Sequence, residues 1–326
     1  MTLKDNELLK ILKAQGISDV SDIRRTEQFT RDRSTLNKIE ILTKDNKIVS
    51  LLEKCTASNA VLHENSMYKY YLNKNVTIPK VFYNSYDQIE HQGILLMEDL
   101  TSTHNSLADW EVPIDPGKLT TLIDLISQFH AASWGKGELS TPKHLENSEE
   151  YVKHLSYLER DYLHFKNHQT FNFGEEQFKI YEKCLTYLRV NTHQHVERIT
   201  SNQNTAFIHG DLNVCNIMYP LMSNSRPYII DLEAVRVGLC TEDLVMLFIH
   251  DLYHGGEDTL RIFEMYYDSI CSKISSEYTY DQFKEDTRLS IMEGIFFPLK
   301  LYTHYGVEDE ELVWKSLNAY ISLIGP

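Results

Sequence analysis

The spacing of hydrophobic residues in the first hundred positions predicts a small β-sheet accompanied by two helices. Apolar residues recur at intervals of three and four over residues 8–17 and 58–73, which is the period of an amphipathic helix. Short apolar runs bounded by polar residues predict strands, and the first two of these runs flank the polar turn 43–46 as a hairpin. The runs predicted as strands are residues 37–42, 47–52, 79–83 and 92–97.

Beyond about residue 100 the pattern becomes mostly helical. A long helix that begins at Asp115 carries apolar residues at positions i, i+3, i+4 and i+7 as far as Trp134. Short apolar runs at 206–208 and 228–230 predict two isolated strands. The other segments predicted as helical are residues 149–165, 176–200 and most of 242–323. The chain therefore divides most naturally near residue 100.

Composition and charge narrow the class of protein. Of 326 residues, 42% are hydrophobic and 24% are charged, which indicates a folded globular chain. The formal net charge of −15 argues against non-specific nucleic-acid binding, which needs a basic surface. No apolar run approaches the ~20 residues of a membrane-spanning helix. We therefore expect neither a nucleic acid nor a membrane as a partner, and the oligomeric state stays open.

The cysteines and the N-terminal residues predict a location. The five cysteines are odd in number and form no Cys-x-x-Cys pair, so neither a disulfide framework nor a structural zinc site is expected. The first ten residues are charged and mixed, unlike a signal peptide. These features predict a soluble cytoplasmic protein.

The strongest chemical signal is a short motif from His209 to Asn216. In His209-Gly-Asp211-Leu-Asn-Val-Cys-Asn216 an asparagine follows an aspartate by five residues, which is the spacing of the protein-kinase catalytic loop. Such a loop places a carboxylate beside an acceptor hydroxyl and an amide oxygen beside a metal ion. The apolar run 228–230 then ends at Asp231, a second carboxylate able to bind a metal. For the first motif alone, an ordinary turn stabilised by Asp211 is the simpler alternative.

The segments HGDLNVCNIMY and IIDLEAVRVGLCTEDL resemble the aminoglycoside phosphotransferase superfamily, which includes choline kinase-like and ecdysteroid kinase-like enzymes. The resemblance implies an α+β, bilobal, protein-kinase-like fold. Its small antiparallel-sheet N-lobe, residues 1–100, would bind nucleotide, and its mostly helical C-lobe, residues 101–326, would carry the catalytic loop and the acceptor-binding helices. By the same resemblance, Asp211 is the catalytic base, and Asn216 and Asp231 bind Mg²⁺.

The resemblance also implies nucleotide-binding residues in the N-lobe. A lysine on the third strand is expected to pair with a helix glutamate, and Lys54 and Glu64 occupy those positions. The lysine would neutralise charge on the α- and β-phosphates, while the glutamate fixes its direction. The run 94–100 resembles the hinge, where the backbone of Glu98 and Leu100 would form hydrogen bonds with adenine.

Three further features need separate interpretation. Kinases cover the phosphates with a glycine-rich loop, but the corresponding turn 29–35 contains no glycine, so it is either an unusual phosphate loop or an ordinary solvated one. Its candidate phosphate contacts are Arg31, Arg33, Ser34 and Thr35. His130 is predicted to be a core histidine with a buried polar partner. Asp243 is predicted to cap the helix that begins near it.

Together these residues predict an ATP- and Mg²⁺-dependent small-molecule kinase, a phosphotransferase with an alcohol group as acceptor. It would transfer the γ-phosphoryl group to a hydroxyl of an antibiotic-, amine- or sterol-like molecule, whose identity the pattern leaves open. The alternative is a nucleotide-binding pseudokinase or scaffold without transferase activity. The joint presence of the lysine, the asparagine and both aspartates argues against that alternative.

Overall fold

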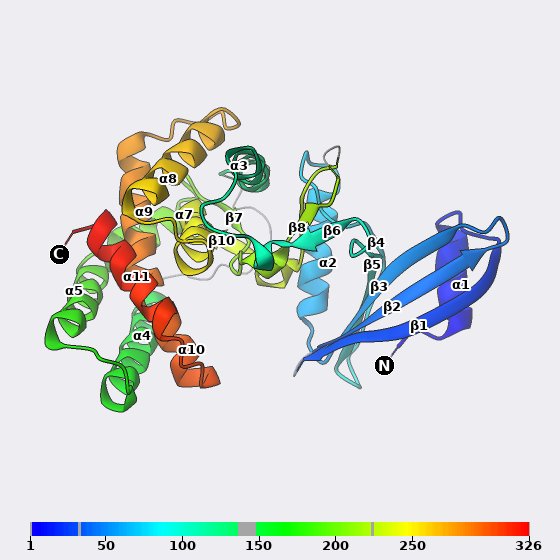
Figure 1. Cartoon of the computed structure of the whole chain (residues 1–326), viewed down its shortest axis with the longest axis horizontal. Helices are drawn as coiled ribbons and strands as arrows, with labels where there is room; N and C mark the ends of the chain where they lie inside the picture. Colours follow the sequence, from blue (N-terminus) through cyan, green and yellow to red (C-terminus); the bar gives the residue numbers. More distant parts are fainter. Residues whose placement is uncertain (1, 32–33, 136–147, 223–224, 326) are drawn as a thin grey trace. The chain divides into compact units, whose positions relative to one another are not determined.

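The computed structural model describes residues 2–31, 34–135, 148–222 and 225–325 (Figure 1). They form two compact units. The first combines Met1–Leu107 with Cys215–Val235, and the second combines Ala108–Val214 with Arg236–Pro326. The chain therefore leaves the first unit, builds part of the second, and returns to the first before it completes the second.

The first unit is built on a five-stranded antiparallel sheet with the strand order β1-β2-β3-β5-β4. Its strands are β1 (Val20–Arg31), β2 (Ser34–Thr43), β3 (Ile48–Thr56), β4 (Val81–Asp87) and β5 (Gln92–Glu98). The four strands predicted from apolar runs are confirmed as β2 to β5. The apolar pattern does not predict β1, because its sequence VSDIRRTEQFTR is mostly polar and its conformation depends on pairing with β2.

Alternate residues of these strands face opposite sides of the sheet. On one side, Leu8 and Leu12 of helix α1 (Asp5–Ala14) pack against a buried apolar cluster. The sheet residues in that cluster are Ile39, Ile41, Leu51, Cys55, Ile94 and Leu96. Intervening residues, among them Leu52 and Lys54 of β3, line a cavity instead. The period of two therefore separates a hydrophobic core from a face that can carry polar chemistry.

Helix α2 (Ala60–Tyr71) and a second small sheet complete the first unit. The sheet has the order β6-β8-β9 and comprises β6 (His104–Ser106), β8 (Ile217–Pro220) and β9 (Tyr228–Ile229). The backbone N–H of Ile229 also donates to the Thr77 carbonyl oxygen at 3.2 Å. These pairings attach the segment 215–235 to the rest of the unit, and the short turn η3 (Leu232–Ala234) follows β9.

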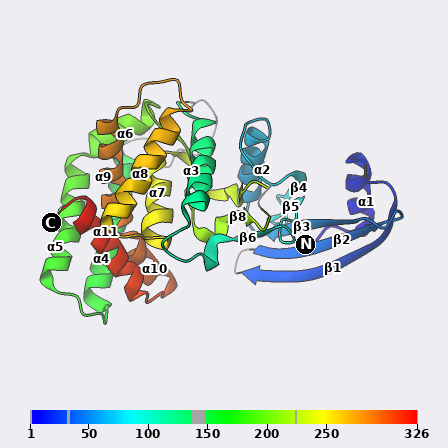
Figure 2. The same cartoon turned by 45° about the horizontal axis from the view of Figure 1, so that its top comes forward.

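The second unit is mostly helical, as the pattern predicts (Figure 2). Its helices are α3 (Pro116–Ala131), α4 (Ser148–His168), α5 (Glu175–Val190), α6 (Thr192–Thr200), α7 (Cys240–Val245), α8 (Gly256–Cys271), α9 (Tyr280–Gly294), α10 (Phe297–Tyr305) and α11 (Glu310–Leu323). The predicted helix 176–200 is two helices, because the chain turns at Asn191 between α5 and α6. A π-helical turn, η4 (Met246–Asp251), follows α7, and β10 (Arg236–Gly238) pairs with β7 (Ala206–Ile208).

Aromatic residues fill much of the helical core. Tyr151, Tyr181 and Tyr266 are fully buried, and the Tyr181 ring lies 5.4 Å from that of Phe296. These tyrosines therefore pack helices together. All five cysteines are free thiols. Within the described parts of the chain, we find no helix that combines the length and the apolar character needed to cross a lipid bilayer.

Candidate active site

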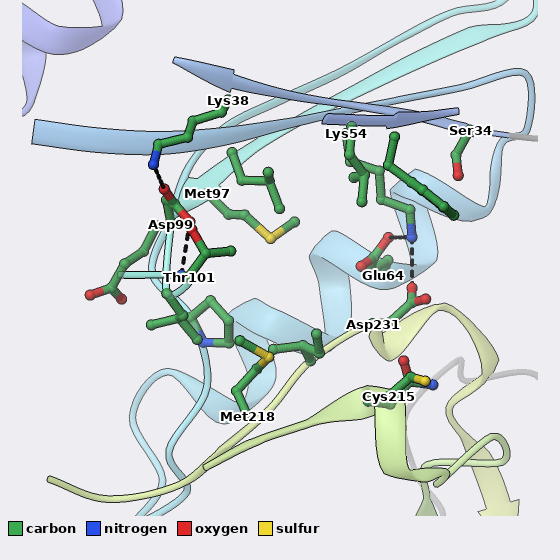
Figure 3. A pocket seen from close by; sticks show the side chains of 18 of the residues that line it. Ser34, Lys38, Lys54, Glu64, Met97, Asp99, Thr101, Cys215, Met218 and Asp231 are labelled. Carbon is green, nitrogen blue, oxygen red and sulfur yellow. Dashed lines mark hydrogen bonds and ion pairs between the residues drawn. The ribbon is translucent and has the colours of Figure 1, made fainter. Parts of the chain in front are cut away.

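Lys54 on β3 is the centre of a charged group in the first unit, which we call the Lys54 cluster (Lys54, Glu64, Asp231 and Glu233). Lys54 Nζ lies 3.0 Å from Glu64 Oε2 on α2 and 2.6 Å from Asp231 Oδ1 after β9 (Figure 3). It also lies 3.0 Å from Glu233 Oε2 on η3. An ammonium group has three N–H donors, so three carboxylates occupy all of them. The structure brings Lys54, Glu64 and Asp231 together and adds Glu233 to them.

Burial and charge act against each other in the Lys54 cluster. Lys54 is 7% exposed and Glu64 is 1% exposed. Burial opposes the charged ammonium, but the three carboxylates, Glu64 first, outweigh it and raise the pKa of Lys54 well above its usual value. Burial also raises the pKa of Glu64 to about 7, although Lys54 works in the opposite direction. One ammonium faces three carboxylates, and the resulting surplus of negative charge attracts cations.

Asp231 has an unusual backbone conformation. Its φ of 62° and ψ of 61° are left-handed, a region that costs a non-glycine residue about 1–3 kcal/mol. The Asp231 backbone N–H donates to the hydroxyl oxygen of Tyr68 on α2 at 3.1 Å. This turn directs the Asp231 carboxylate to Lys54. Backbone strain of this kind concentrates at functional sites.

A cavity of about 310 Å³ includes three members of this cluster, Lys54, Glu64 and Asp231, in its wall. Lys54, Glu64 and Asp231 lie toward one end, and Lys38 and Asp99 lie toward the other (Figure 3). The apolar side chains along it include Phe29, Leu36, Leu52, Pro79, Met97, Leu100, Met218 and Ile230. The predicted hinge residues Glu98 and Leu100 are both in its wall. A cavity with apolar walls and charged side chains at its ends favours a ligand that has both apolar and charged parts.

The backbone after β5 is fixed by Asp99. Asp99 Oδ1 accepts hydrogen bonds from the backbone N–H of Thr101 at 2.9 Å and from its hydroxyl at 2.7 Å. Lys38 Nζ lies 3.5 Å from Asp99 Oδ2. This local turn and ion pair hold the backbone that runs from Glu98 through Leu100 along the cavity.

Asn216 lies in the wall of the same cavity. The backbone carbonyl oxygen of Asn216 accepts a hydrogen bond from the Ile230 backbone N–H at 3.0 Å. This bond fixes Asn216 beside the residue that precedes Asp231. Carboxylate oxygens of Glu64, Asp231 and Glu233 lie within 4.8 Å of one another. These three oxygens already converge on the Lys54 ammonium. Asn216 and Asp231 carry the amide and carboxylate oxygens that Mg²⁺ prefers, so these two residues fit the predicted divalent cation.

The described residues of the segment 29–35, which was predicted as a glycine-free phosphate turn, belong to the end of β1 and the start of β2. The side chains of Phe29 and Ser34 line the cavity, so Ser34 brings a hydroxyl to it. Thr35 lies within β2, and Arg31 is the last residue of β1. Arg33 lies outside the described residues.

The predicted base Asp211 lies in the second unit, on the loop that follows β7. The residues just before it are held by Asp243 of α7, which accepts from the backbone N–H of His209 at 2.6 Å and of Gly210 at 3.0 Å. The prediction that Asp243 caps a helix is wrong, because α7 begins three residues before it and its carboxylate binds the loop instead. Asp243 therefore has a structural role, but its partners are the amides of this loop and not those of a helix start.

His130 confirms the prediction of a core histidine with a buried polar partner. It is 0% exposed, and its Nε2 lies 3.0 Å from Asp243 Oδ2 while its Nδ1 lies 2.7 Å from the Tyr266 hydroxyl. Because the carboxylate can only accept, Nε2–H donates to Asp243, while Nδ1 and the Tyr266 hydroxyl share the second hydrogen bond. Burial opposes the charged form of Asp243, but the His130 hydrogen bond and the loop amide of His209 help to lower its pKa.

Asp251, the last residue of η4, holds the loop on the other side of Asp211. Its Oδ2 accepts from the Val214 backbone N–H at 2.8 Å. Burial raises the pKa of Asp251, the Val214 hydrogen bond opposes this, and the charge of Asp211 adds to it. The π-helical turn is a rare element that occurs frequently at functional sites.

Sequence reasoning missed three polar residues at these positions: Glu233, Tyr68 and Asp251. Glu233 has a local signal, because it follows Asp231 by two residues in the motif already singled out. Tyr68 has none, since its partner Asp231 is 163 residues away. Asp251 is 37 residues from Val214, so only the fold connects them.

Solved structures of small-molecule kinases share this fold at low sequence identity. APH(4)-Ia, an aminoglycoside phosphotransferase in a thermostable mutant form complexed with ADP and hygromycin B, is 10% identical with a TM-score of 0.56, over 97% of each chain. Plasmodium vivax ethanolamine kinase is 11% identical with a TM-score of 0.55, over 93% of this chain and 82% of that one. Aminoglycoside phosphotransferase APH(3'')-Id from Streptomyces rimosus, with ADP and streptomycin, is 16% identical with a TM-score of 0.51, over 91% of this chain and 99% of that one.

These similarities show the α+β, bilobal, protein-kinase-like fold that the motifs imply. No curated protein matches the sequence. The model of the ecdysteroid kinase-like family matches residues 43–274, which include the sheet strands β3 to β5, the Lys54 cluster and the loop around Asp211. Since that match spans well over half of the sequence, the chain belongs to the ecdysteroid kinase-like family.

Proposed function

We propose that this protein is an ATP- and Mg²⁺-dependent small-molecule kinase that transfers the γ-phosphoryl group to an acceptor hydroxyl. The observation that carries the proposal is the buried Lys54, held between Glu64 and Asp231 in the wall of a cavity that the hinge also lines. Membership of a kinase-like family and the fold shared with small-molecule kinases support it.

The cavity explains how a nucleotide would bind. Adenine would lie between the apolar walls and form hydrogen bonds with the backbone carbonyl of Glu98 and the N–H of Leu100. The phosphates would then extend toward Lys54, whose positive charge neutralises them. Glu64 fixes the direction of the ammonium from α2. The ADP found with hygromycin B and with streptomycin in two structural relatives supports a nucleotide in this fold.

Phosphoryl transfer of this kind depends mostly on positioning and charge neutralisation. Asn216 and Asp231 would hold Mg²⁺, which supplies positive charge to the phosphate oxygens when bound. Asp211 would orient the acceptor hydroxyl and accept its proton. The loop amides held by Asp243 and Asp251 keep the backbone around Asp211 fixed for that task.

The acceptor is proposed by class: an antibiotic-, amine- or sterol-like molecule that carries a hydroxyl group. The family name points to ecdysteroids, and the structural relatives carry hygromycin B, carry streptomycin, or are named as an ethanolamine kinase. No feature of the cavity chooses among these acceptor classes, because we propose that the cavity binds the nucleotide and not the acceptor.

An ATP-consumption screen over hydroxyl-bearing sterols, amines and antibiotics tests the proposal. At least one acceptor should raise ATP turnover above the rate without acceptor, and EDTA should abolish the increase. A matched reaction with the Asp211→Asn variant separates transfer from contaminating ATPase activity. Nucleotide binding without stimulation by any acceptor would favour the pseudokinase or scaffold instead.

A further inference from the structure

All three donors of the Lys54 ammonium are occupied in the structure. The carboxylate oxygens of Glu64, Asp231 and Glu233 lie at 3.0, 2.6 and 3.0 Å from Nζ, which are distances of charge-assisted hydrogen bonds. Lys54 can bind a phosphate oxygen only through one of these same N–H groups. At least one carboxylate must therefore yield its place before Lys54 contacts a phosphate.

Exposure separates Glu64 from the other two carboxylates, because the Asp231 side chain is 38% exposed and the Glu233 side chain is 45% exposed. The Glu64 side chain is 1% exposed, so its release from Lys54 would leave a buried charge unpaired. Asp231 is directed to Lys54 by its left-handed turn and by the hydroxyl of Tyr68. The Glu233 side chain is 45% exposed, so water can solvate its carboxylate once it leaves.

The position of Glu233 supports the same conclusion. The described residues that line the cavity include Glu64 and Asp231 but not Glu233, so Glu233 reaches Lys54 from outside the cavity wall. Its withdrawal would free a donor without reshaping the cavity. Glu233 lies on the single turn η3, and that turn need not move for its side chain to rotate into solvent.

We propose that Glu233 competes with the phosphates of the nucleotide for Lys54 and thereby weakens the binding of nucleotide that carries no divalent cation. The inference rests on the proposed function, because it takes the cavity to be the nucleotide site. Metal-free nucleotide brings only negative charge to a cluster in which three carboxylates already surround one ammonium. A divalent cation bound with the phosphates offsets that surplus, so Glu233 acts as a determinant of selectivity for metal-bound nucleotide.

Calorimetric titration of the full chain with ADP, in EDTA and in excess Mg²⁺, tests this inference. The variants are Glu233→Ala, which removes the competing carboxylate, and Glu233→Gln, which removes its charge but keeps a weaker acceptor. Glu90→Ala is the matched control, because Glu90 is an exposed residue of the same unit in the turn between β4 and β5. Thermal unfolding of each variant confirms that the fold is intact.

We expect Glu233→Ala to bind metal-free ADP about tenfold more tightly than wild type, which corresponds to about 1.4 kcal/mol. Glu233→Gln should show a smaller gain, and the control should show none. In Mg²⁺ the gain should shrink to about threefold or less, because the cation already offsets the charge of the cluster.

Three other outcomes overturn the inference. Equal affinity of wild type and both variants for metal-free ADP would show that Glu233 does not compete. Weaker binding in Mg²⁺ with unchanged binding in EDTA would make Glu233 a contributor to the metal site. If wild type binds ADP under neither condition, the nucleotide site itself is wrong and the proposed function fails with it, whereas the first two outcomes leave that function standing.

Discussion

In the first unit three carboxylates share the ammonium of Lys54, whereas in the second unit the carboxylates of Asp243 and Asp251, here called the loop anchors, accept backbone amides. The Lys54 cluster contains the lysine predicted to bind phosphate, and the loop anchors hold the loop that carries the predicted base Asp211. The two groups differ in their balance of charge, since the Lys54 cluster has more negative than positive charge. The Asp243 carboxylate, in contrast, is buried and receives donors on both oxygens.

This difference separates a group arranged for ligand chemistry from one that supports a loop. A buried carboxylate that receives several donors is rigid and costly to disturb. A cluster with surplus charge, solvent-exposed members and a strained aspartate can change partners when a ligand brings new charge. We therefore expect substitutions at the loop anchors to affect folding first, and substitutions in the exposed part of the Lys54 cluster to affect ligand binding first.

The largest effect is expected from Asp243→Ala. The variant leaves buried N–H groups of His209, Gly210 and His130 without their acceptor. Loss of one partner of such a buried charged group costs about 3–5 kcal/mol, measured as the free energy of unfolding in urea. Glu233→Ala, at a half-exposed ion pair, should cost about 1 kcal/mol or less. Equal losses in the two variants would remove the distinction between the two groups.

A second prediction concerns acid stability of the helical unit. Burial lowers the pKa of His250, whose ring lies 4.8 Å from that of Phe297, to about 4. The unfolded chain takes up a proton below about pH 6.5, but the folded chain does so only near pH 4, so stability falls as the pH drops through this window. At about 1.36 kcal/mol per pKa unit, the loss approaches about 3 kcal/mol at pH 4.

The His250→Asn variant tests this directly. Its unfolding free energy at neutral pH should be lower because of lost packing, but its slope between pH 6.5 and 4 should be flatter than that of wild type. His193→Asn is the control, because the His193 side chain is 86% exposed. A slope unchanged by His250→Asn would show that other groups govern the acid response.

The Asp211→Asn variant tests the proposed chemical role of the loop that the loop anchors hold. The change keeps the size of the side chain but removes the proposed base, so kcat should fall by at least ~10²-fold while nucleotide affinity is retained. Turnover is measured with an acceptor found in the screen, and affinity by calorimetry. Full activity in the variant would remove Asp211 from the mechanism.

The smallest effect is expected for Asp231→Ala in the presence of nucleotide. Ligand that binds only the folded state stabilises it by about 1.4 kcal/mol at ten times its Kd. MgATP should therefore raise the melting temperature of wild type but shift the variant little, because the variant lacks the proposed metal ligand. A shift equal to that of wild type would place the metal elsewhere.

Local sequence patterns were sufficient to predict most of the helices and strands. Apolar alternation predicted β2 to β5, and helical spacing predicted the long helix α3. These patterns failed where pairing with a neighbouring strand decides the conformation. β1 is mostly polar and becomes a strand by pairing with β2, and β6, β8 and β10 have only three or four residues each. Runs that short carry little periodicity, and β7 and β9, which are as short, were predicted from the apolar runs 206–208 and 228–230.

The sequence by itself determined the residue types of the proposed chemistry and their local spacing. The motif His209 to Asn216, the strand ending at Asp231 and the lysine at position 54 lie in continuous segments, and backbone periodicity assigns them to strand ends and loops. The resemblance to the aminoglycoside phosphotransferase superfamily also implied that Lys54 pairs with Glu64, and the structure contains this pair.

Only the tertiary structure decided which charges share one site. Glu233 lies 179 residues from Lys54 along the chain and Asp231 lies 177 residues away, yet both bind the same ammonium. The structure likewise decided that Asp243 and Asp251 hold the loop around Asp211. The physical reason is that hydrogen bonds and ion pairs act over about 3 Å in space, whereas sequence periodicity reports only on neighbours within one strand or helix.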